Sequence, residues 1–462
     1  MTARLARARV PLALAALAAA VRLPAFLASR HLHFDDGVYG ASVVGMRSGM
    51  KPFEDLFSPQ GPLHLVSLYA GDVVGLRTDV SPRITPVVAG VVAAIAVWLA
   101  GSRLGRQGGA LIAAVLVATT GTMLWTTAPI TGDGIAIACA FVAVAGALAY
   151  RDRPSLARAV ATGIAMGAGL SVKALVVTAA LPVGWWLWSH RRARDLAAAV
   201  GAAVAVGVAA TAPFGFGPVW EQSVEYHRDS EYLYGPGEQF NKLCSTLVDR
   251  DLPLLVAVGL ALVFVARRRA RLRSDDAVLG AWLLASVLVL VFEPAMFRNH
   301  IVIAVAPLAL FVARHPPPAR VFAAAMVVSG VWWASHMWDL LAPDGYQGAA
   351  AELVDELRTL PPDARAISDE PGFVWRAGLR PAPDMNDASI KRINEGQITT
   401  AVVARAAGES DVCAVVVWSN RFGDELPGLP EALRDVGYER VREWPRDRAL
   451  WLKRGCGAGT RG

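Results

Sequence analysis

Long apolar runs, separated by short polar or basic segments, dominate the first 338 residues of the chain. A helix that spans a membrane needs about 20 mostly apolar residues. Segments that approach this length lie near residues 10–28, 83–101, 108–125, 134–150, 157–172, 174–189, 195–214, 252–266, 277–294, 300–314 and 321–338. The pattern predicts an all-α polytopic membrane protein with about eleven transmembrane helices within residues 1–338.

Composition supports this reading. Of the 462 residues, 54% are hydrophobic and only 18% are charged, whereas soluble domains are about 25% charged. The first apolar run follows Arg4, Arg7 and Arg9 but precedes no small-residue cleavage site. It is therefore predicted to be a retained span rather than a signal peptide.

Basic residues exceed acidic ones by 45 to 39, a formal charge of +6. The excess stands in short arginine clusters between apolar runs, which is typical of membrane orientation and not of a nucleic-acid-binding face. If the short segment 62–77 does not cross the membrane, all these clusters share the side of the N-terminus. The positive-inside rule then predicts a multi-pass plasma-membrane protein with a cytoplasmic N-terminus, and segment 62–77 becomes an interfacial or re-entrant helix.

Residues 339–462 are polar enough to form a small α/β domain outside the membrane. Helices are predicted over 347–360 and 427–437, and strands over 364–368, 412–418, 438–444 and 448–453. The four cysteines, Cys139, Cys244, Cys413 and Cys456, show no CxxC pair or zinc spacing. This spacing is compatible with a single disulfide outside the cytoplasm, but it does not require one.

The predicted topology places three polar stretches on the external face: the first loop, 29–61, a short turn at 126–133 and a longer loop, 215–251. Asp35 and Asp36 are either a functional pair or the solvated start of a helix. Asp133 alone is explained equally well as a helix cap. Lys173 interrupts about thirty apolar residues, so it is either functional or a snorkelling side chain.

Two further patterns favour structural explanations. The pair Gly163 and Gly167 lies within a predicted span, where small residues four apart serve helix packing. In the loop 215–251, His227 has the acidic neighbours Glu225 and Asp229. A solvated loop helix explains this cluster better than a metal site.

Five short motifs stand in a fixed order along the membrane part. They are Asp35-Asp36-Gly37-Val38-Tyr39, Ser58-Pro59-Gln60-Gly61-Pro62-Leu63, Asp133, Ser171-Val172-Lys173-Ala174 and Arg298-Asn299-His300. Over residues 10–315 this order resembles the GT-C glycosyltransferases, and is similar to bacterial aminoarabinose transferases and protein O-mannosyltransferases. The first motif matches the Asp-Glu-x-x-Tyr of that superfamily, whereas Gln60 replaces its lysine.

The resemblance implies a transferase that moves a sugar from a polyprenyl-phosphate donor to an acceptor hydroxyl, with inversion. It implies that Asp35 is the base, and that Asp36 and Asp133 orient the substrates. The lipid phosphate is expected to be held by Lys173, Arg298 and His300, and the substrates to be contacted by Tyr39 and Gln60. The sugar stays undetermined, and the acceptor is a lipid, a polysaccharide or a protein. No cofactor is predicted. The sequence does not decide whether a divalent metal ion is bound, because paired acids can hold one.

Two other functions compete with this hypothesis. A transporter or flippase for a lipid-linked sugar would also carry intramembrane charges, but transporters usually show paired halves and charges near the membrane midplane. Here the notable charges cluster at one face, and no internal repeat is found. The other competitor is a non-catalytic partner in a cell-envelope complex, with the tail as its binding module.

Overall fold

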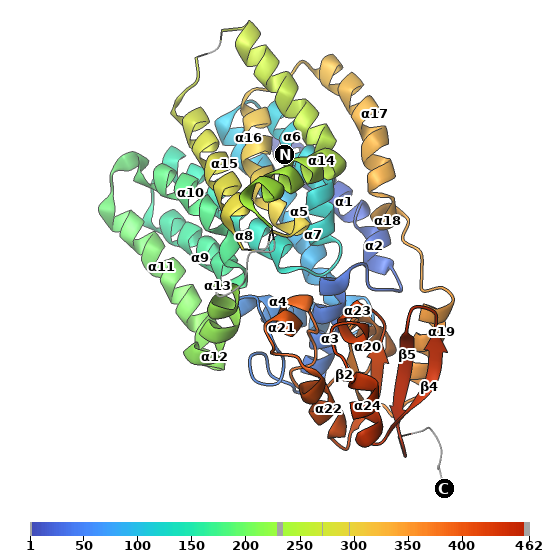
Figure 1. Ribbon diagram of the computed structural model, residues 1–462. Coiled ribbons are helices and arrows are strands. Elements are labelled where there is room, and N and C mark those ends of the chain that lie inside the picture. Colours follow the sequence, from blue (N-terminus) through green and yellow to red (C-terminus); the bar gives the residue numbers. More distant parts are fainter. Residues whose placement is uncertain (1, 229–233, 270, 295, 457–462) are drawn as a thin grey trace.

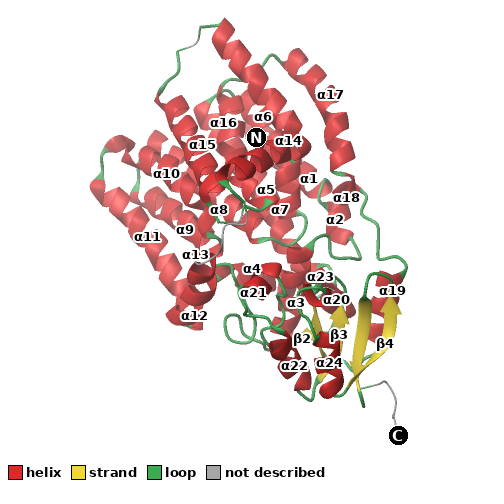
Figure 2. Ribbon diagram, viewed as in Figure 1, coloured by secondary structure: helices red, strands yellow, loops and turns green. Residues whose placement is uncertain are grey.

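The computed structural model describes residues 2–228, 234–269, 271–294 and 296–456. Figure 1 shows a helical bundle, with a smaller unit containing the only sheet of the described residues below it. Figure 2 shows that the bundle itself is built of helices and loops. Its main helices are α1 (Thr2–Ala20), α5 (Ile84–Leu104), α6 (Gln107–Thr119), α7 (Gly121–Thr127), α8 (Gly132–Asp152), α9 (Leu156–Val172), α10 (Ala180–Leu187), α11 (Ala193–Thr211), α14 (Pro236–Arg267), α15 (Ser274–Phe292), α16 (Val302–Arg314) and α17 (Ala319–His336).

Small residues bring the bundle helices close together. Helix α8 packs against α5 on one side and α9 on the other. A Cβ atom on Gly163 would lie 2.0 Å from the Ala199 carbonyl oxygen, and one on Gly167 would lie 2.6 Å from that of Ala203. Helix packing therefore explains the glycine pair of α9, as predicted.

The predicted number of about eleven spans is not confirmed. Among the described residues, four helical stretches are long and apolar enough to cross a membrane: Ser81–Leu104, Gly132–Asp152, Ala193–Phe214 and Ser274–Phe292. Helices α6 and α7 make a fifth if the pair, bent by 55°, is one span. Other predicted spans are shorter or broken; α16 has 13 residues, or about 20 Å of helix.

The arginine-rich loops gather at one end of the bundle. Arg151, at the end of α8, lies 3.1 Å from Asp275 at the start of α15, and also donates to the Arg103 carbonyl. Arg314, at the end of α16, lies 3.1 Å from the same Asp275. These loops therefore share one face, opposite the end of α8 that carries Asp133.

Residues 29–77 form two short helices between the bundle and the sheet, α3 (Phe34–Arg47) and α4 (Leu63–Val74) (Figure 1). Helix α4 has 12 residues, or about 18 Å, which is too short to cross a bilayer. Its buried Asp72 pairs with Arg47 of α3 at 2.7 Å. This geometry supports the prediction that segment 62–77 does not span the membrane.

The C-terminal sheet has the strand order β2-β1-β3-β5-β4, with β1 parallel to β2 and β3, and β5 antiparallel to β3 and β4. Its strands are β1 (Arg365–Ser368), β2 (Arg380–Pro381), β3 (Val412–Val417), β4 (Tyr438–Trp444) and β5 (Arg448–Lys453). The helices around it are α19 (Ala349–Arg358), α20 (Gly372–Ala377), α21 (Ile390–Asn394), α22 (Thr400–Gly408), α23 (Asn420–Gly423) and α24 (Leu429–Asp435). Four strands and two helices match the predicted ranges, whereas β2 and α20–α23 were not anticipated.

Both faces of this sheet are covered, which explains why every residue of β3 is buried. Val415 packs in one cluster with Val403 of α22 and Leu433 of α24, while Val416 packs in another with Leu353 of α19. A disulfide joins Cys413 of β3 to Cys456, which follows β5. The end of the described chain is thereby fixed to the middle of the sheet.

Glycines bring the C-terminal unit into backbone contact with α3. A Cβ atom on Gly37 would lie 2.6 Å from the Gly372 amide nitrogen, and one on Gly40 would lie 2.2 Å from the Trp375 ring. The buried Arg376 donates to the carbonyl of Ala28 at 2.8 Å. The unit is therefore packed onto the first external segment and not merely tethered to the bundle.

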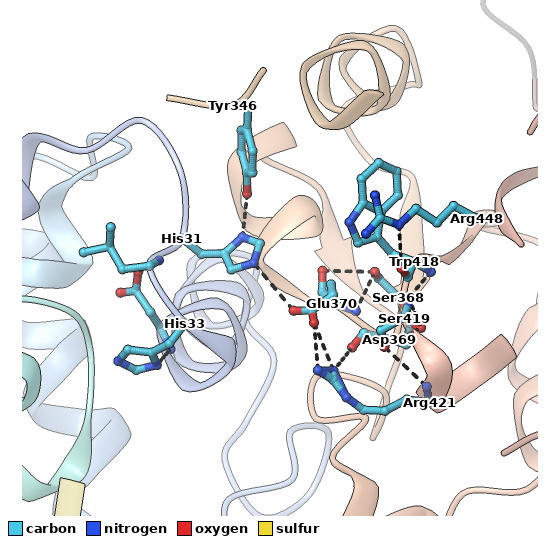
Figure 3. A network of polar contacts seen from close by, with 12 residues as sticks. His31, His33, Tyr346, Ser368, Asp369, Glu370, Trp418, Ser419, Arg421 and Arg448 are labelled. Atoms are coloured by element: carbon cyan, nitrogen blue, oxygen red, sulfur yellow. Dashed lines mark hydrogen bonds and ion pairs between the residues drawn. The ribbon is translucent and has the colours of Figure 1, made fainter. Parts of the chain in front are cut away.

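A polar network extends the same contact (Figure 3). His31 contacts the Tyr346 hydroxyl at 2.5 Å through Nδ1, and its Nε2 lies 3.5 Å from Glu370. Glu370 also pairs with Arg421 at 2.7 Å. His31, which precedes α3, thus meets three residues of the C-terminal unit, Tyr346, Glu370 and Arg421, in one cluster.

Candidate functional site

The predicted site residues Asp133, Lys173 and His300 converge at the end of the bundle opposite the arginine-rich loops. The Lys173 ammonium lies 2.8 Å from Oδ1 of Asp133 and 3.1 Å from Nε2 of His300. His300 Nδ1 lies in turn 2.8 Å from Oε1 of Glu293. Four side chains from α8, the end of α9 and the segment 293–300 therefore form one continuous chain of polar contacts.

This row of contacts indicates which groups donate and which accept hydrogen bonds. Glu293 accepts from Nδ1–H of His300, so Nε2 of a neutral imidazole is the acceptor for Lys173. An ammonium group has three N–H donors, and Asp133 and His300 take two of them. The third has no partner among the described residues.

Local structure explains why Asp133 faces Lys173. Thr131 is the N-cap of α8, and its hydroxyl accepts from the Gly134 amide. Asp133 therefore does not cap the helix, which removes the structural alternative considered from the sequence. Lys173 follows α9 in an extended conformation, and its side chain is only 13% exposed, so it does not extend freely into solvent.

Gln60 and Tyr39 adjoin this chain of contacts. The Gly61 amide donates to the Val172 carbonyl at 2.9 Å, and a Cβ on Gly61 would lie 2.3 Å from the Ser171 carbonyl oxygen. This close approach holds Gln60 beside the Tyr39 hydroxyl. Oε1 of Gln60 is buried and accepts no hydrogen bond from the described residues, a state that is rare for a buried polar atom.

Asp35 and Asp36 have different surroundings although they are adjacent. Asp36 is fully buried, and its carboxylate binds the Arg83 guanidinium through both oxygens, at 2.5 and 3.2 Å. It also accepts from the backbone amides of Leu32 and Ile130. Burial alone would raise the pKa of Asp36, but the Arg83 charge outweighs it and holds that pKa well below its usual range. Asp36 is thus fully engaged within the protein.

Asp35, in contrast, is half-buried and makes no hydrogen bond or ion pair with any residue that the structure describes. Its charge acts on the Tyr39 hydroxyl, and the residues around this hydroxyl, namely Asp35, Gln60 and Asp133, together with Lys173, are called the mouth of the candidate site below. Burial raises the pKa of the Tyr39 hydroxyl well above its usual value, and the negative charge of Asp35 adds to this shift. The N-cap of α3 is His33, whose side chain accepts a hydrogen bond from the Asp36 amide, so Asp35 does not cap the helix.

Arg298 lies apart from the row of polar contacts that joins Asp133 to Glu293, in a second, basic group. It is exposed, and its charge acts on Lys242 and Arg250 of α14. Burial and then the Arg298 charge lower the pKa of Lys242. Three positive charges therefore lie at this end of the bundle, on Lys242, Arg250 and Arg298. Lys242 and Arg250 were not predicted as site residues.

Other residues were missed for lack of a local signal. His64 of α4 is buried and meets the Tyr39 ring edge to face, with 4.3 Å between ring centroids. Asp387, in the C-terminal unit, is 5% exposed and its charge also acts on Tyr39. Nothing in the sequence around Asp387 distinguishes it from an ordinary turn.

The loop 215–251 lies against the loop that precedes α4. His227 Nε2 donates to the Pro59 carbonyl at 2.8 Å, and Ser223 donates to that of Gln60. Asp229 lies outside the described residues. Among those that are described, no three His, Cys, Asp or Glu side chains are arranged to hold a metal ion.

Residues 71–215 match the family described as dolichyl-phosphate-mannose-protein mannosyltransferase. Comparison with curated protein sequences gives no match. Among solved structures, ArnT from Cupriavidus metallidurans bound to undecaprenyl phosphate aligns over 99% of both chains, with 14% identity and a TM-score of 0.69. Its apo form aligns over 97% of this chain and 98% of its own, with 14% identity and a TM-score of 0.68.

The archaeal oligosaccharyltransferase AglB from Archaeoglobus fulgidus, in complex with an inhibitory peptide and a dolichol-phosphate, is more distant. The alignment covers 97% of this chain and 74% of AglB, with 12% identity and a TM-score of 0.56. The likeness to ArnT includes the C-terminal unit, because it extends over nearly the whole of both chains. The chain therefore shares its overall fold with these solved ArnT and AglB structures.

Proposed function

We propose that this protein is a membrane glycosyltransferase that moves a sugar from a polyprenyl-phosphate donor to an acceptor hydroxyl. One observation carries the proposal: Asp35 is a carboxylate without a described partner, at a mouth also lined by Tyr39, Gln60 and the Asp133–Lys173 pair. The fold supports it, because the ArnT structure that aligns over the whole chain binds undecaprenyl phosphate.

In the proposed reaction the acceptor oxygen attacks the anomeric carbon while its proton passes to a carboxylate oxygen of Asp35. The bond between the anomeric carbon and the phosphate oxygen breaks, and the lipid phosphate leaves with one additional negative charge. A single displacement inverts the anomeric configuration. A well-placed general base contributes roughly 10²- to 10⁴-fold in rate.

The departing phosphate needs hydrogen-bond donors and positive charges beside it. The third N–H of Lys173 and the cations Lys242, Arg250 and Arg298 lie on the correct side for this task. His300 acts through Lys173, because both of its ring nitrogens already have partners. Asp36 holds α3 in place through Arg83, and Asp133 orients Lys173, so neither is required to contact the sugar.

The active face is proposed to be the outer face of the plasma membrane. The arginine-rich loops share the opposite face, as the positive-inside rule expects of the cytoplasmic side. The Cys413–Cys456 disulfide lies on the side of the candidate site, and disulfides persist in oxidising compartments. The N-terminus is then cytoplasmic and the C-terminal unit is extracytoplasmic.

The test uses the full-length protein in nanodiscs with a panel of polyprenyl-phosphate-linked mannose, glucose, arabinose and aminoarabinose. Release of polyprenyl phosphate is measured together with sugar transfer to added membrane and cell-wall fractions. Asp35→Asn is expected to lower transfer by roughly 100-fold or more without changing expression. Asp79→Asn, an exposed carboxylate of the same external region, is the matched control.

Near-normal transfer by Asp35→Asn would remove Asp35 from the role of base. Movement of the donor across sealed vesicles without any sugar transfer would instead establish the transporter. If the wild-type protein neither binds undecaprenyl phosphate nor transfers any of these sugars, the proposed function itself is wrong.

A further inference from the structure

The direction of the Asp35 side chain is set indirectly. Its carboxylate makes no hydrogen bond or ion pair within the part of the chain that the structure describes. Its direction therefore depends on the backbone of α3 and on the residues on either side. Successive residues of an α-helix point about 100° apart. If Phe34 and Asp36 are both held, the first turn of α3 cannot rotate about the helix axis, and the direction of Asp35 is fixed.

The bundle holds α3 at Asp36. This carboxylate is fully buried and binds the Arg83 guanidinium at 2.5 and 3.2 Å. It also accepts from the backbone amides of Leu32, which precedes α3, and of Ile130, which precedes α8. One side of the first turn of α3 is therefore tied to the bundle.

The C-terminal unit holds α3 at Phe34. The guanidinium carbon of Arg421 lies 4.1 Å from the centroid of the Phe34 ring, within the range of a cation–π contact. Two nitrogens of Arg421 lie 3.2 and 2.7 Å from Oε1 of Glu370, and one of them donates to the Asp369 carbonyl at 2.6 Å. The guanidinium is therefore fixed within the C-terminal unit, and the Phe34 ring lies against it.

Glu370 extends this contact to the residues that precede α3. Its other oxygen, Oε2, lies 3.5 Å from Nε2 of His31, whose Nδ1 contacts the Tyr346 hydroxyl at 2.5 Å (Figure 3). A Cβ atom on Gly372 would lie 2.0 Å from Nδ1 of His31, so the imidazole lies directly on the Gly372 backbone. One carboxylate thus contacts both Arg421 and His31.

The sheet topology explains why these groups meet. Glu370 follows β1 and Arg421 follows the neighbouring parallel strand β3, while the chain first leaves β1 for β2 on the opposite side. The Asp369 carboxylate joins the two strand ends, because it accepts from two backbone amides that follow β3. In open α/β sheets, ligands bind where the strand order changes direction in this way. Here His31 and Phe34 of the same chain contact that edge.

We propose that Glu370 and Arg421 are positioning residues of the transfer reaction, which direct the Asp35 carboxylate through their contacts with His31 and Phe34. This inference rests on the proposed function, in which Asp35 receives the acceptor proton. Without these contacts α3 stays attached through Asp36, but its first turn can rotate. A misdirected base lowers turnover and leaves donor binding unchanged. Misplacement of a reacting group by about 1 Å can cost roughly 100-fold in rate.

Hydrogen exchange of the full-length protein in nanodiscs measures the contact itself. The readout is the exchange rate of the amides of residues 36–40, in the first turns of α3. Arg421→Leu is expected to accelerate this exchange roughly fivefold or more, and Phe34→Leu to act in the same way. Phe34→Tyr keeps the aromatic ring and is expected to retain slow exchange. Arg405→Leu, at an exposed arginine of α22 in the same unit, is the matched control.

Transfer kinetics then test whether the contact acts through Asp35. Arg421→Leu is expected to lower kcat about tenfold, with the donor KM and undecaprenyl phosphate binding unchanged. The double variant Arg421→Leu/Asp35→Asn is expected to be no slower than Asp35→Asn alone, because residues that act as a unit are not additive. Arg421→Lys keeps the positive charge and should recover part of the loss. Glu370→Gln should resemble Arg421→Leu, and it keeps the test decisive if Arg421→Leu fails to fold.

The inference is overturned if Arg421→Leu and Glu370→Gln exchange like the wild type, if Arg421→Leu slows transfer by the same factor with and without Asp35, or if it raises the donor KM and leaves kcat unchanged. A wild-type protein that transfers no sugar is a different result, since it contradicts the proposed function. Accelerated exchange in Arg421→Leu would then assign Glu370 and Arg421 a purely structural role.

Discussion

The ammonium group of Lys173 lies 2.8 Å from the carboxylate of Asp133, and both side chains are almost completely shielded from solvent, at 13% and 3% exposure. Lys173 follows α9 and Asp133 lies in the first turn of α8, so this pair fixes neighbouring ends of two bundle helices relative to each other. Because His300 takes a second donor of the same ammonium group, the direction of the third is set as well. The pair therefore combines a structural task with the proposed phosphate contact.

Lys173→Met is expected to destabilise the protein by about 3–5 kcal/mol, because it leaves the Asp133 carboxylate buried without a partner. Thermal unfolding in detergent measures the effect. The double variant Lys173→Met/Asp133→Asn removes both charges and is expected to recover most of the stability but not the binding of undecaprenyl phosphate. Equal stability of the single and double variants would contradict this coupling.

Asp36→Asn and Asp35→Asn are expected to fail in different ways. Asp36 forms a fully buried ion pair with Arg83, so Asp36→Asn should cost about 3–5 kcal/mol and lower the yield of folded protein. Asp35→Asn should leave the unfolding temperature unchanged and lower only turnover. Measurements of thermal unfolding and of activity on both variants therefore distinguish the structural role of Asp36 from the catalytic role proposed for Asp35. An Asp36→Asn protein of normal stability would show that Arg83 finds another partner.

Acid should weaken the same ion pair. The pKa of Asp36 is lowered in the folded protein relative to its ordinary value of 3.8, so the folded state binds fewer protons than the unfolded state in the interval between the two values. Its stabilising contribution is complete above about pH 4–5 and is lost as the pH falls through the folded pKa. Unfolding temperatures between pH 3 and pH 7 should therefore fall less steeply for Asp36→Asn than for the wild type. Parallel curves would show that other groups control the acid sensitivity.

The native Cys244 tests the membrane orientation without any engineering. It is an exposed free cysteine in the external part of α14, before the predicted span 252–266. A membrane-impermeant maleimide applied to intact cells is expected to label the wild type but not Cys244→Ser. Arg192→Cys, among the arginine-rich loops, should be labelled only after permeabilisation. The reverse pattern would place the candidate site in the cytoplasm.

Reduction of the disulfide should destabilise the C-terminal unit. The bond closes a separation of 43 residues, for which the chain-entropy relation gives about 4 kcal/mol. Cys413→Ser and dithiothreitol treatment of the wild type should lower the unfolding temperature to a similar extent. If dithiothreitol has no effect on the wild type, the two cysteines are not joined in the protein as purified.

Hydropathy and charge were sufficient to predict the helical bundle, the common face of the arginine-rich loops and the short helix α4, because each depends on the chain's own apolar pattern. They overestimated the continuity of the spans. The apolar residues 174–189, for example, form a 3₁₀ turn followed by the eight-residue α10. Apolarity alone does not report such a break.

The candidate site was only partly accessible from the sequence. Asp35, Asp133, Lys173 and His300 stand next to apolar spans, so their placement at span ends was visible in the pattern. The difference between Asp35 and Asp36 depends on Arg83, which lies 47 residues further along the chain. The contacts of Asn386 with Phe57 and Ser42 join positions more than 320 residues apart, which no local pattern indicates.

The backbone contact between Gly37 and Gly372 limits how the molecule can work. Since no side chain separates α3 from the C-terminal unit there, the two parts cannot slide or swing without breaking a closely packed seam. In the proposed transfer reaction, loading and unloading would then depend on smaller rearrangements in the loops that border the candidate site. A shortened chain ending near residue 338 would lack this contact, so α3, which carries Asp35, would lose the surface against which its glycines pack.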